Sequence, residues 1–304
     1  MHRILRATTP GLRQRRQSRA WLLATAPGIT IDREAAAGRA QAARSCVADD
    51  DLILQTRDLG KDFRGFTAVN GVNLQIARGS IHALIGPNGA GKTTCFNLLT
   101  RFLPVTRGSI QFKSVDITGM APQAVACAGL VRSFQISSVF AQMSALHNVR
   151  IALQRSTGLS YQFWRSGRSL QRLDARALEL LDQVGLSGDA GRRTVELPYG
   201  RKRALEIATT LAAEPELMLL DEPTQGMGHE DVARITELIR RVAAGRTVLM
   251  VEHNMSVVAG LCDRITVLAR GSVLAEGSYA EVARNPAVRE AYMGASENEL
   301  QAAH

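Results

Sequence analysis

The chain has 304 residues, 45% of them hydrophobic, which is enough for one domain with a full core and a subdomain. It contains no run of about 18 apolar residues, which excludes a membrane-spanning helix, and no secretory signal. The net charge is +9, but nine arginines and two acids in residues 1–45 supply +7 of it. The remaining +2 does not predict nucleic acid as a partner.

The cysteines lack metal-site spacing, which indicates reduced, mostly buried thiols in a cytosolic protein: Cys46, Cys95, Cys127 and Cys262.

Residues 1–50 differ from the rest of the chain. They are rich in arginine and lack sustained hydrophobic periodicity. We expect a disordered leader here, or a start site assigned too early, and the composition also fits a transit peptide. Regular patterning begins at Leu52, so a domain is expected over residues 52–294, with a tail at 295–304.

Short strands are expected on both sides of a glycine-rich segment. Apolar residues alternate with polar ones at residues 72–76 and again at 110–112, as in half-buried strands. Between them, residues 81–85 form an apolar run that ends at a glycine. These short strands predict an antiparallel layer packed beside a nucleotide-binding core.

The second half of the chain alternates between helical and strand patterns. Helical spacing marks three segments, at residues 170–184, 203–213 and 232–242. Apolar runs typical of buried strands lie at residues 217–220, 248–251 and 265–268. Because a helix separates the first two of these strands, they are expected to be parallel. The sequence therefore predicts an α/β fold with a parallel-sheet core.

A phosphate-binding loop is the strongest motif. It fits G-x-x-x-x-G-K-[ST], follows a predicted strand and precedes a helical segment. Its glycines would let backbone N–H groups turn toward phosphate oxygens, while Lys92 would supply charge to the β- and γ-phosphates and Thr93 a ligand for Mg²⁺. The residues predicted to bind nucleotide here are Gly86, Pro87, Asn88, Gly89, Ala90, Gly91, Lys92, Thr93 and Thr94.

Two carboxylates follow the apolar strand at residues 217–220. Asp221 is predicted to hold Mg²⁺, mostly through water, and Glu222 to orient or deprotonate the attacking water. On its own, a strand followed by two acids is as typical of a solvated strand end. Together with the phosphate loop, the pair indicates nucleotide hydrolysis.

With these motifs the chain resembles the ABC ATPase family. The resemblance covers about residues 52–294 and implies a P-loop cassette with a parallel-sheet core, an antiparallel β layer and a helical subdomain at about 136–213. It implies that Gln135 touches Mg²⁺ and water, and that its loop contacts the membrane partner. It further implies that His253 reaches the γ-phosphate and that the Phe63 ring lies against adenine.

The segment 197–201 occupies the position of the family's LSGGQ signature, which closes over ATP held by a second subunit. Only Leu197 and Gly200 agree with that pattern, so the role is carried over to Gly200. Pro198 lacks the hydroxyl and the N–H of the serine it replaces. In the following loop, Gly228 stands where the family has an aspartate.

Within the family, the chain looks most like the ATP-binding subunits of branched-chain amino-acid importers. The marks are Phe96-Asn97-Leu98-Leu99-Thr100, Val131-Arg132-Ser133-Phe134-Gln135, Tyr199-Gly200 and Ala291-Tyr292-Met293-Gly294. Urea and amide importers and the lipopolysaccharide-export ATPase share much of this pattern, and these cargoes stay open.

The resemblance implies an ATPase that uses ATP and Mg²⁺ and works peripherally at the cytoplasmic face of the inner membrane. Its expected partners are permease subunits, a second like or unlike ATPase subunit and, indirectly, a periplasmic solute-binding protein. Two alternatives remain. One is a soluble ABC protein acting on ribosomes or DNA; the other is a degenerate ATPase, suggested by Pro198, that binds nucleotide but scarcely hydrolyses it.

Overall fold

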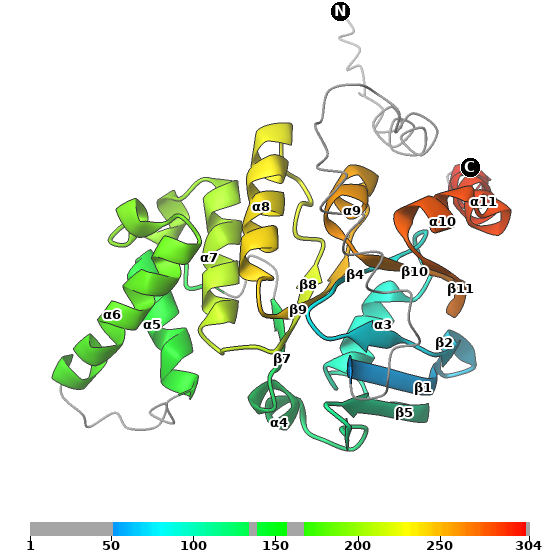
Figure 1. The fold of residues 1–304 in the computed structure, drawn as a ribbon, viewed down its shortest axis with the longest axis horizontal. Coiled ribbons are helices and arrows are strands. Elements are labelled where there is room, and N and C mark those ends of the chain that lie inside the picture. Colours follow the sequence, from blue (N-terminus) through cyan, green and yellow to red (C-terminus); the bar gives the residue numbers. More distant parts are fainter. Residues whose placement is uncertain (1–50, 134–138, 157–166, 302–304) are drawn as a thin grey trace, which may run out of the picture.

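The computed structural model describes residues 51–133, 139–156 and 167–301. The predicted leader at residues 1–50, the predicted site residue Gln135 and residues 302–304 of the predicted tail lie outside these ranges. The described part consists of two β-sheets and the helices around them (Figure 1).

The secondary structure alternates along the chain between strands and helices. The strands are β1 (Leu52–Phe63), β2 (Phe66–Val72), β3 (Gln75–Ala77), β4 (Ile81–Ile85), β5 (Arg107–Phe112), β6 (Val115–Asp116), β7 (Leu130–Ser133), β8 (Leu217–Asp221), β9 (Thr247–Val251), β10 (Arg264–Ala269) and β11 (Ser272–Gly277). The helices are α3 (Lys92–Leu99), α4 (Pro122–Cys127), α5 (Ala145–Ser156), α6 (Gly167–Gln183), α7 (Tyr199–Leu211), α8 (His229–Val242), α9 (Met255–Leu261), α10 (Tyr279–Arg284) and α11 (Pro286–Gln301). Two 3-10 turns precede α7, namely η3 (Ser187–Asp189) and η4 (Thr194–Glu196).

The larger sheet has the strand order β11-β10-β4-β9-β8-β7. Neighbouring strands are parallel except for β11, which runs antiparallel to β10. Every residue of β4, β8 and β9 is buried, because both faces of the sheet are covered. Alternate residues of β4 therefore enter different cores, with Ala83 on the side of the long helices and Leu84 on the side of α3.

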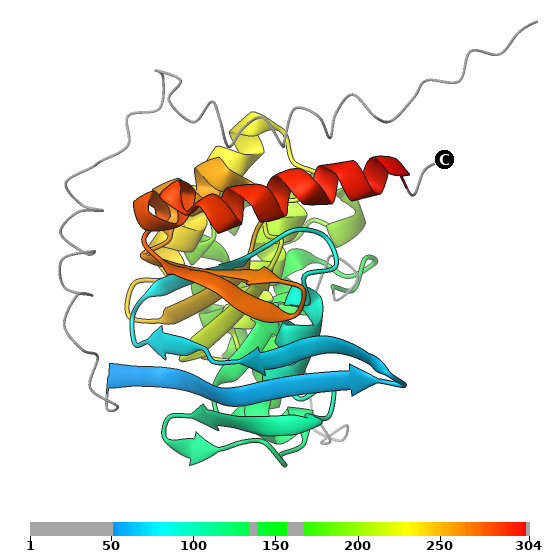
Figure 2. The ribbon, with the colours of Figure 1, turned by 90° about the vertical axis from the view of Figure 1, so that its right-hand side faces the viewer.

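The smaller sheet is antiparallel, with the order β2-β1-β5-β6 and β3 paired to β1. Figure 2 shows the layers, with this sheet below, the larger sheet above it and α11 across the top. The buried residues Phe96 and Leu99 of α3 share one core with Ile110 of β5 and Leu249 of β9. Helix α3 is thus held between the two sheets, which fixes the loop that precedes it.

Helices α5, α6 and α7 lie together at one side of the molecule (Figure 1). They occupy the part of the chain in which a helical subdomain is predicted. Their buried residues Val149, Leu181 and Leu205 belong to the same core as Leu220 of β8. The helical group therefore shares one hydrophobic core with the strand that carries Asp221.

The expected elements are all present, although most of them begin or end a few residues away from the expected bounds, and two of these differences have a local cause. The alternation at residues 72–76 is confirmed, since buried and exposed residues alternate, but the chain leaves the ladder at 73–74 and divides it into β2 and β3. The helix expected at 203–213 begins earlier, at Tyr199, because Pro198 with a φ of −56° forms its N-cap.

The thiols differ partly from expectation. Cys95 is buried and Cys262 is half-buried, but Cys127, at the end of α4, is exposed. Across the described ranges, we find no helix that is both long and apolar enough to cross a membrane.

Candidate active site

The phosphate loop at residues 86–93 connects β4 to α3. The strand ends at Ile85 and the helix begins at Lys92, so the loop lies between a buried strand and a helix N-terminus. Asn88 and Gly89 are exposed at its tip. The N–H groups at a helix N-terminus and the positive end of the helix dipole make this position favourable for an anion.

Two glycines of the loop are required by its geometry. Gly86 has a φ of 154°, and a Cβ there would lie 2.2 Å from the carbonyl oxygen of Leu268 in β10. Gly91 has a φ of 98°, and a Cβ there would lie 2.6 Å from the carbonyl oxygen of Ala68 in β2. The loop is therefore packed against both sheets, and any larger residue at these positions would displace backbone.

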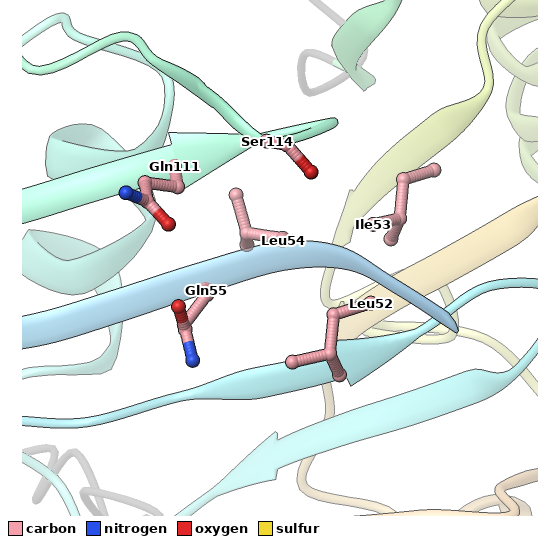
Figure 3. A pocket seen from close by; sticks show the side chains of 6 residues that line it. All are labelled: Leu52, Ile53, Leu54, Gln55, Gln111 and Ser114. Carbon is pink, nitrogen blue, oxygen red and sulfur yellow. The ribbon is translucent and has the colours of Figure 1, made fainter. Parts of the chain in front are cut away.

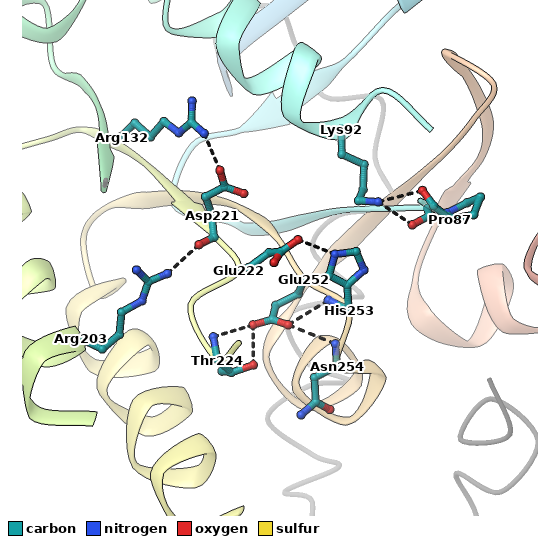
Figure 4. A network of polar contacts seen from close by, with 11 residues as sticks. Pro87, Lys92, Arg132, Arg203, Asp221, Glu222, Thr224, Glu252, His253 and Asn254 are labelled. Atoms are coloured by element: carbon teal, nitrogen blue, oxygen red, sulfur yellow. Dashed lines mark hydrogen bonds and ion pairs between the residues drawn. The ribbon is translucent and has the colours of Figure 1, made fainter. Parts of the chain in front are cut away.

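The Lys92 ammonium group folds back onto its own loop. Its Nζ donates hydrogen bonds to the carbonyl oxygens of Gly86 at 2.8 Å and Pro87 at 2.9 Å (Figure 4). Burial lowers the pKa of Lys92, and the nearby carboxylates of Glu222 and Asp221 oppose that shift. Lysine and both carboxylates thus belong to one electrostatic site, as the motifs predict.

Asp221 ends β8, and its carboxylate pairs with Arg132 of β7. Arg132 also donates to Oδ1 of Asn97, in α3, at 2.5 Å, and its guanidinium lies 5.8 Å from the ring centroid of Phe96. Arg132 therefore links the phosphate-loop helix to the carboxylate. The sequence reasoning quoted this arginine only as a mark of resemblance and missed its contact with Asp221.

Glu222 and His253 face each other across the carboxyl ends of β8 and β9 (Figure 4). Nε2 of His253 lies 2.5 Å from Oε1 of Glu222. The backbone N–H of Glu222 donates to the carbonyl oxygen of Val251 at 2.9 Å, which keeps the two loops together. The structure thus brings together two residues that the sequence reasoning assigned separately.

Glu252 is a buried residue that the sequence reasoning missed. It is 3% exposed, and its Oε1 accepts from the N–H of Thr224 at 2.9 Å and from the Thr224 hydroxyl at 2.6 Å. Its Oε2 accepts from the N–H groups of His253 at 2.9 Å and Asn254 at 3.1 Å. One carboxylate therefore joins the loop after β8 to the loop after β9. The sequence feature that could have identified Glu252 was its position between a buried strand and His253.

Tyr292 connects α11 to the phosphate loop. Burial raises the pKa of the Tyr292 phenol, while a hydrogen bond with the backbone of Gly86 acts in the opposite direction. The ring packs against the core that contains Ile85 and Val288. The C-terminal segment thus supports the first residue of the loop, a contact that sequence spacing alone did not indicate.

The segment that resembles the signature lies at the start of α7, away from these contacts. A Cβ on Gly200 would lie 2.9 Å from the carboxyl group of Asp231 in α8, so glycine permits the close approach of the two helices. The Tyr199 hydroxyl donates to the carbonyl oxygen of Gln225 at 3.1 Å. The described contacts of this segment therefore run to α8, to the loop after Glu222 and, through the ion pair of Arg201 with Asp189, to η3.

Two further predicted site residues stand apart from this network. The Phe63 ring ends β1, is 41% exposed, and has the Lys61 ammonium 5.1 Å from its centroid. In the ladder between β1 and β2, Lys61 pairs with Val69. The side chain of Val69 lies beside Gly91 of the phosphate loop. Gln135 lies outside the described residues, and its role stays a prediction.

Similarity to known proteins identifies the chain. The sequence profile described as "ABC transporter" matches residues 69–225. LivG of Escherichia coli K12, a high-affinity branched-chain amino acid transport ATP-binding protein, is 38% identical over 250 residues, covering 80% of this chain and 98% of LivG. The chain belongs to the ABC transporter ATP-binding family. It is an ATPase cassette of the α/β class, and this family dimerises and works with permease subunits.

Other similarities agree with this family assignment. A second profile, described as "Branched-chain amino acid ATP-binding cassette transporter", matches residues 272–298. BraF of Pseudomonas aeruginosa is 36% identical over 252 residues, covering 80% of this chain and 98% of BraF. The crystal structure of a nucleotide-free ATP-binding cassette from an ABC transporter has a TM-score of 0.70 at 28% identity, covering 79% of this chain and 98% of that one.

The residues of this ABC cassette are suited to a magnesium ion that enters the site bound to the nucleotide. The described residues contain no group of three or more acidic, histidine or cysteine side chains suited to a metal. Mg²⁺ keeps several waters and needs only one or two protein ligands beside the phosphates. The exposed Thr93 at the start of α3 and the Asp221 carboxylate at the end of β8 are donors of the required kind.

A shallow pocket elsewhere on the cassette is separate from this site (Figure 3). It has a volume of about 150 Å³ and lies between β1 and β5, lined by Leu52, Ile53, Leu54, Gln55, Gln111 and Ser114. It adjoins the first residues of β1, whereas the phosphate loop contacts the hairpin at the far end of that strand. Its lining offers no titratable group for catalysis.

Proposed function

We propose that the chain binds ATP with Mg²⁺ at residues 86–94 and hydrolyses the γ-phosphate bond. Backbone N–H groups of the loop hold the phosphates, and Lys92 turns from the carbonyl oxygens of its own loop to the β- and γ-phosphates. Thr93, Gln135 and Asp221 are the proposed protein contacts of Mg²⁺. When bound, this ion neutralises charge on the phosphate oxygens.

Glu222 is the proposed general base, and the contact that supports this role is the one with His253. The carboxylate of Glu222 emerges at the end of β8 and its Oε1 is 2.5 Å from Nε2 of His253. In this arrangement Glu222 takes the proton of the attacking water, while His253 orients the carboxylate and reaches the γ-phosphate. Phe63 stacks on adenine in the same proposal.

ATP is proposed to be enclosed between two such subunits, like or unlike. Gly200, at the N-terminus of α7, then contributes backbone N–H groups to the ATP of the opposite subunit. Pro198 and Tyr199 alter this surface, which favours an unlike partner that supplies a complete signature segment. Closure around ATP and reopening after hydrolysis would drive the transport cycle.

An exposed apolar patch is the proposed contact with a permease at the cytoplasmic face of the inner membrane. Phe140 is 52% exposed, Met143 41% and Val195 46%. The N–H of Thr194 donates to the carbonyl oxygen of Met143 at 2.9 Å, so the two segments form one surface. Gln135 precedes Phe140 by five positions in the sequence, and its segment would report permease movement to the site.

The proposed cargo is a branched-chain amino acid, captured outside by a solute-binding protein. The match of residues 272–298 to a profile of that description favours it, as do the names of LivG and BraF. Reconstituted with its permease and binding protein, the complex should import leucine on addition of ATP. Import of urea or an amide without import of leucine would show that this cargo assignment is wrong.

Replacement of Glu222 by Gln tests the catalytic proposal. We expect steady phosphate release to fall at least about 100-fold, because a general base contributes that much or more. Binding of a fluorescent ATP analogue should persist. Glu237→Gln, on the exposed face of α8, is the matched control. Steady turnover close to that of the wild type in Glu222→Gln would overturn the assignment.

A further inference from the structure

Glu222 has a strained backbone. Its φ is 46°, in the left-handed region that residues with a side chain rarely adopt. It also directly precedes Pro223, and a residue before proline favours an extended conformation. Such strain persists only where surrounding contacts determine the conformation, and it is concentrated at functional sites.

The Arg203 side chain is hydrogen-bonded to the backbone on both sides of Glu222. Arg203, in α7, donates from Nη2 to the carbonyl oxygen of Asp221 at 2.6 Å. Its Nε donates to the carbonyl oxygen of Pro223 at 3.2 Å. Figure 4 shows the contact with Asp221. The planar guanidinium presents donors in a fixed fork, so it holds both carbonyl groups in one geometry.

Arg203 is itself fixed by a buried partner one turn further along α7. Its Nη1 donates to Oε2 of Glu206 at 2.6 Å, and the two residues are 5% and 1% exposed. Burying an ion pair costs desolvation energy that well-packed apolar residues would avoid. Overall stability is therefore a weak reason for this pair, whereas its bonds to the catalytic loop give it a specific role.

A second contact joins the same helix to the same loop. The Tyr199 hydroxyl, at the start of α7, donates to the carbonyl oxygen of Gln225 at 3.1 Å. Helix α7 thus holds the segment 221–225 near its first residue and again one turn later. A shift of α7 reaches the backbone of Glu222 directly.

We propose that Arg203 is a positioning residue for Glu222, and that it couples the helix behind the signature segment to the catalytic carboxylate. The inference rests on the proposed role of Glu222. When α7 is in place, the guanidinium holds the strained turn and aims the carboxylate at the water. When α7 moves, the carbonyl groups are released and the carboxylate loses its alignment.

The variant Arg203→Lys tests this coupling in the purified full chain. Lysine keeps a positive charge for Glu206 but has no planar fork for two carbonyl groups. We expect kcat to fall about 10- to 100-fold, as for a small misplacement of a catalytic group, with the KM for ATP within about twofold of the wild type.

A matched control exists on α8. Arg240 donates to Glu237, three positions earlier, at 2.6 Å and to the carbonyl oxygen of Gly260 at 2.9 Å. This arginine also combines a glutamate of its own helix with a carbonyl group, but the pair is exposed and these hydrogen bonds do not involve Glu222 or its neighbours. Arg240→Lys should leave kcat and KM unchanged.

A double-variant cycle separates positioning from general destabilisation. If Arg203 acts through Glu222, adding Arg203→Lys to Glu222→Gln should not lower the residual single-turnover rate further. An equal loss in both backgrounds would overturn the proposal, as would wild-type kcat in Arg203→Lys. Steady turnover in Glu222→Gln alone would instead overturn the proposed base.

A second variant covers the case in which Arg203→Lys does not fold. Replacing both Arg203 and Glu206 by Gln removes the two charges together, so that neither stays buried without a partner. Circular dichroism first checks that this protein is folded. The same cycle is then run, and the same equal loss in both backgrounds would contradict the positioning role.

Discussion

Nε2 of His253 lies 2.5 Å from Oε1 of Glu222, although 31 positions separate them in the chain. The contact exists because β8 and β9 are adjacent parallel strands whose carboxyl ends meet at one edge of the sheet. Glu252, immediately before His253, holds the same two loops together through Thr224. The separation of the Glu222 and His253 side chains is therefore set by the strand pairing and by the Glu252 carboxylate.

Replacement of His253 by Ala should lower kcat about 10- to 100-fold, because the carboxylate of Glu222 loses the group that orients it. ATP affinity should stay within about threefold, since the phosphate loop is unchanged. Phosphate release and titration with a fluorescent ATP analogue measure the two quantities. His147→Ala, at an exposed position in α5, is the control and should behave as the wild type.

Replacement of Lys92 by Met should weaken ATP binding by at least about tenfold, as expected for loss of a charge-assisted bond to phosphate. The side chain is buried beside Asp221 and Glu222, so the variant also removes a cation near both carboxylates, of which Asp221 keeps its ion pair with Arg132. Equilibrium titration with nucleotide gives the affinity. Lys113→Met, which removes the ion pair with Glu216 and the hydrogen bond to the carbonyl oxygen of Ala128, should bind ATP normally. Equal affinity in both variants would contradict the role of Lys92.

Gly86→Ala should destabilise the fold severely. The added Cβ would lie 2.2 Å from the carbonyl oxygen of Leu268, a backbone atom that cannot move without distorting β10. Gly245→Ala is the matched control, because Gly245 has a φ of 75° but open space around its Cβ position. We expect a loss of about 1 kcal/mol there and several times more at Gly86. Thermal unfolding midpoints compare the two, and similar midpoints would show that Gly86 is not confined.

His82 should make the protein less stable in mild acid. It is fully buried in β4, where burial and then the charge of Arg264 lower its pKa from 6.5 to about 3. As pH falls below 6.5, the unfolded chain takes up a proton that the folded chain refuses. The folded state therefore loses stability between pH 6.5 and about 3, by up to about 1.4 kcal/mol per pH unit.

The variant His82→Gln isolates this contribution. Glutamine can keep a hydrogen bond to the Thr266 hydroxyl, which lies 2.8 Å from Nε2 of His82, but does not titrate. Urea unfolding at about pH 7 and about pH 5 should show a smaller loss of stability in the variant than in the wild type. Equal losses would place the acid sensitivity elsewhere.

Local chemistry made much of this site predictable from the sequence. The phosphate loop is one short segment whose glycine spacing and lysine have a direct physical purpose. Asp221 was identified because a buried parallel strand is a continuous apolar run that ends where polar side chains emerge. The fold class followed in the same way, from strands and helices that alternate along the chain.

Only the tertiary structure decided how the motifs are connected. Arg203 sits in an ordinary helical pattern, and nothing in its neighbourhood in the sequence shows that its guanidinium holds the carbonyl groups beside Glu222. The contacts of Glu252 with Thr224 and of Tyr292 with Gly86 likewise join residues far apart in the chain. Sequence spacing determines which groups a strand end or loop presents, whereas contacts between distant segments depend on how sheets and helices pack, and that packing sets the alignment of the catalytic groups.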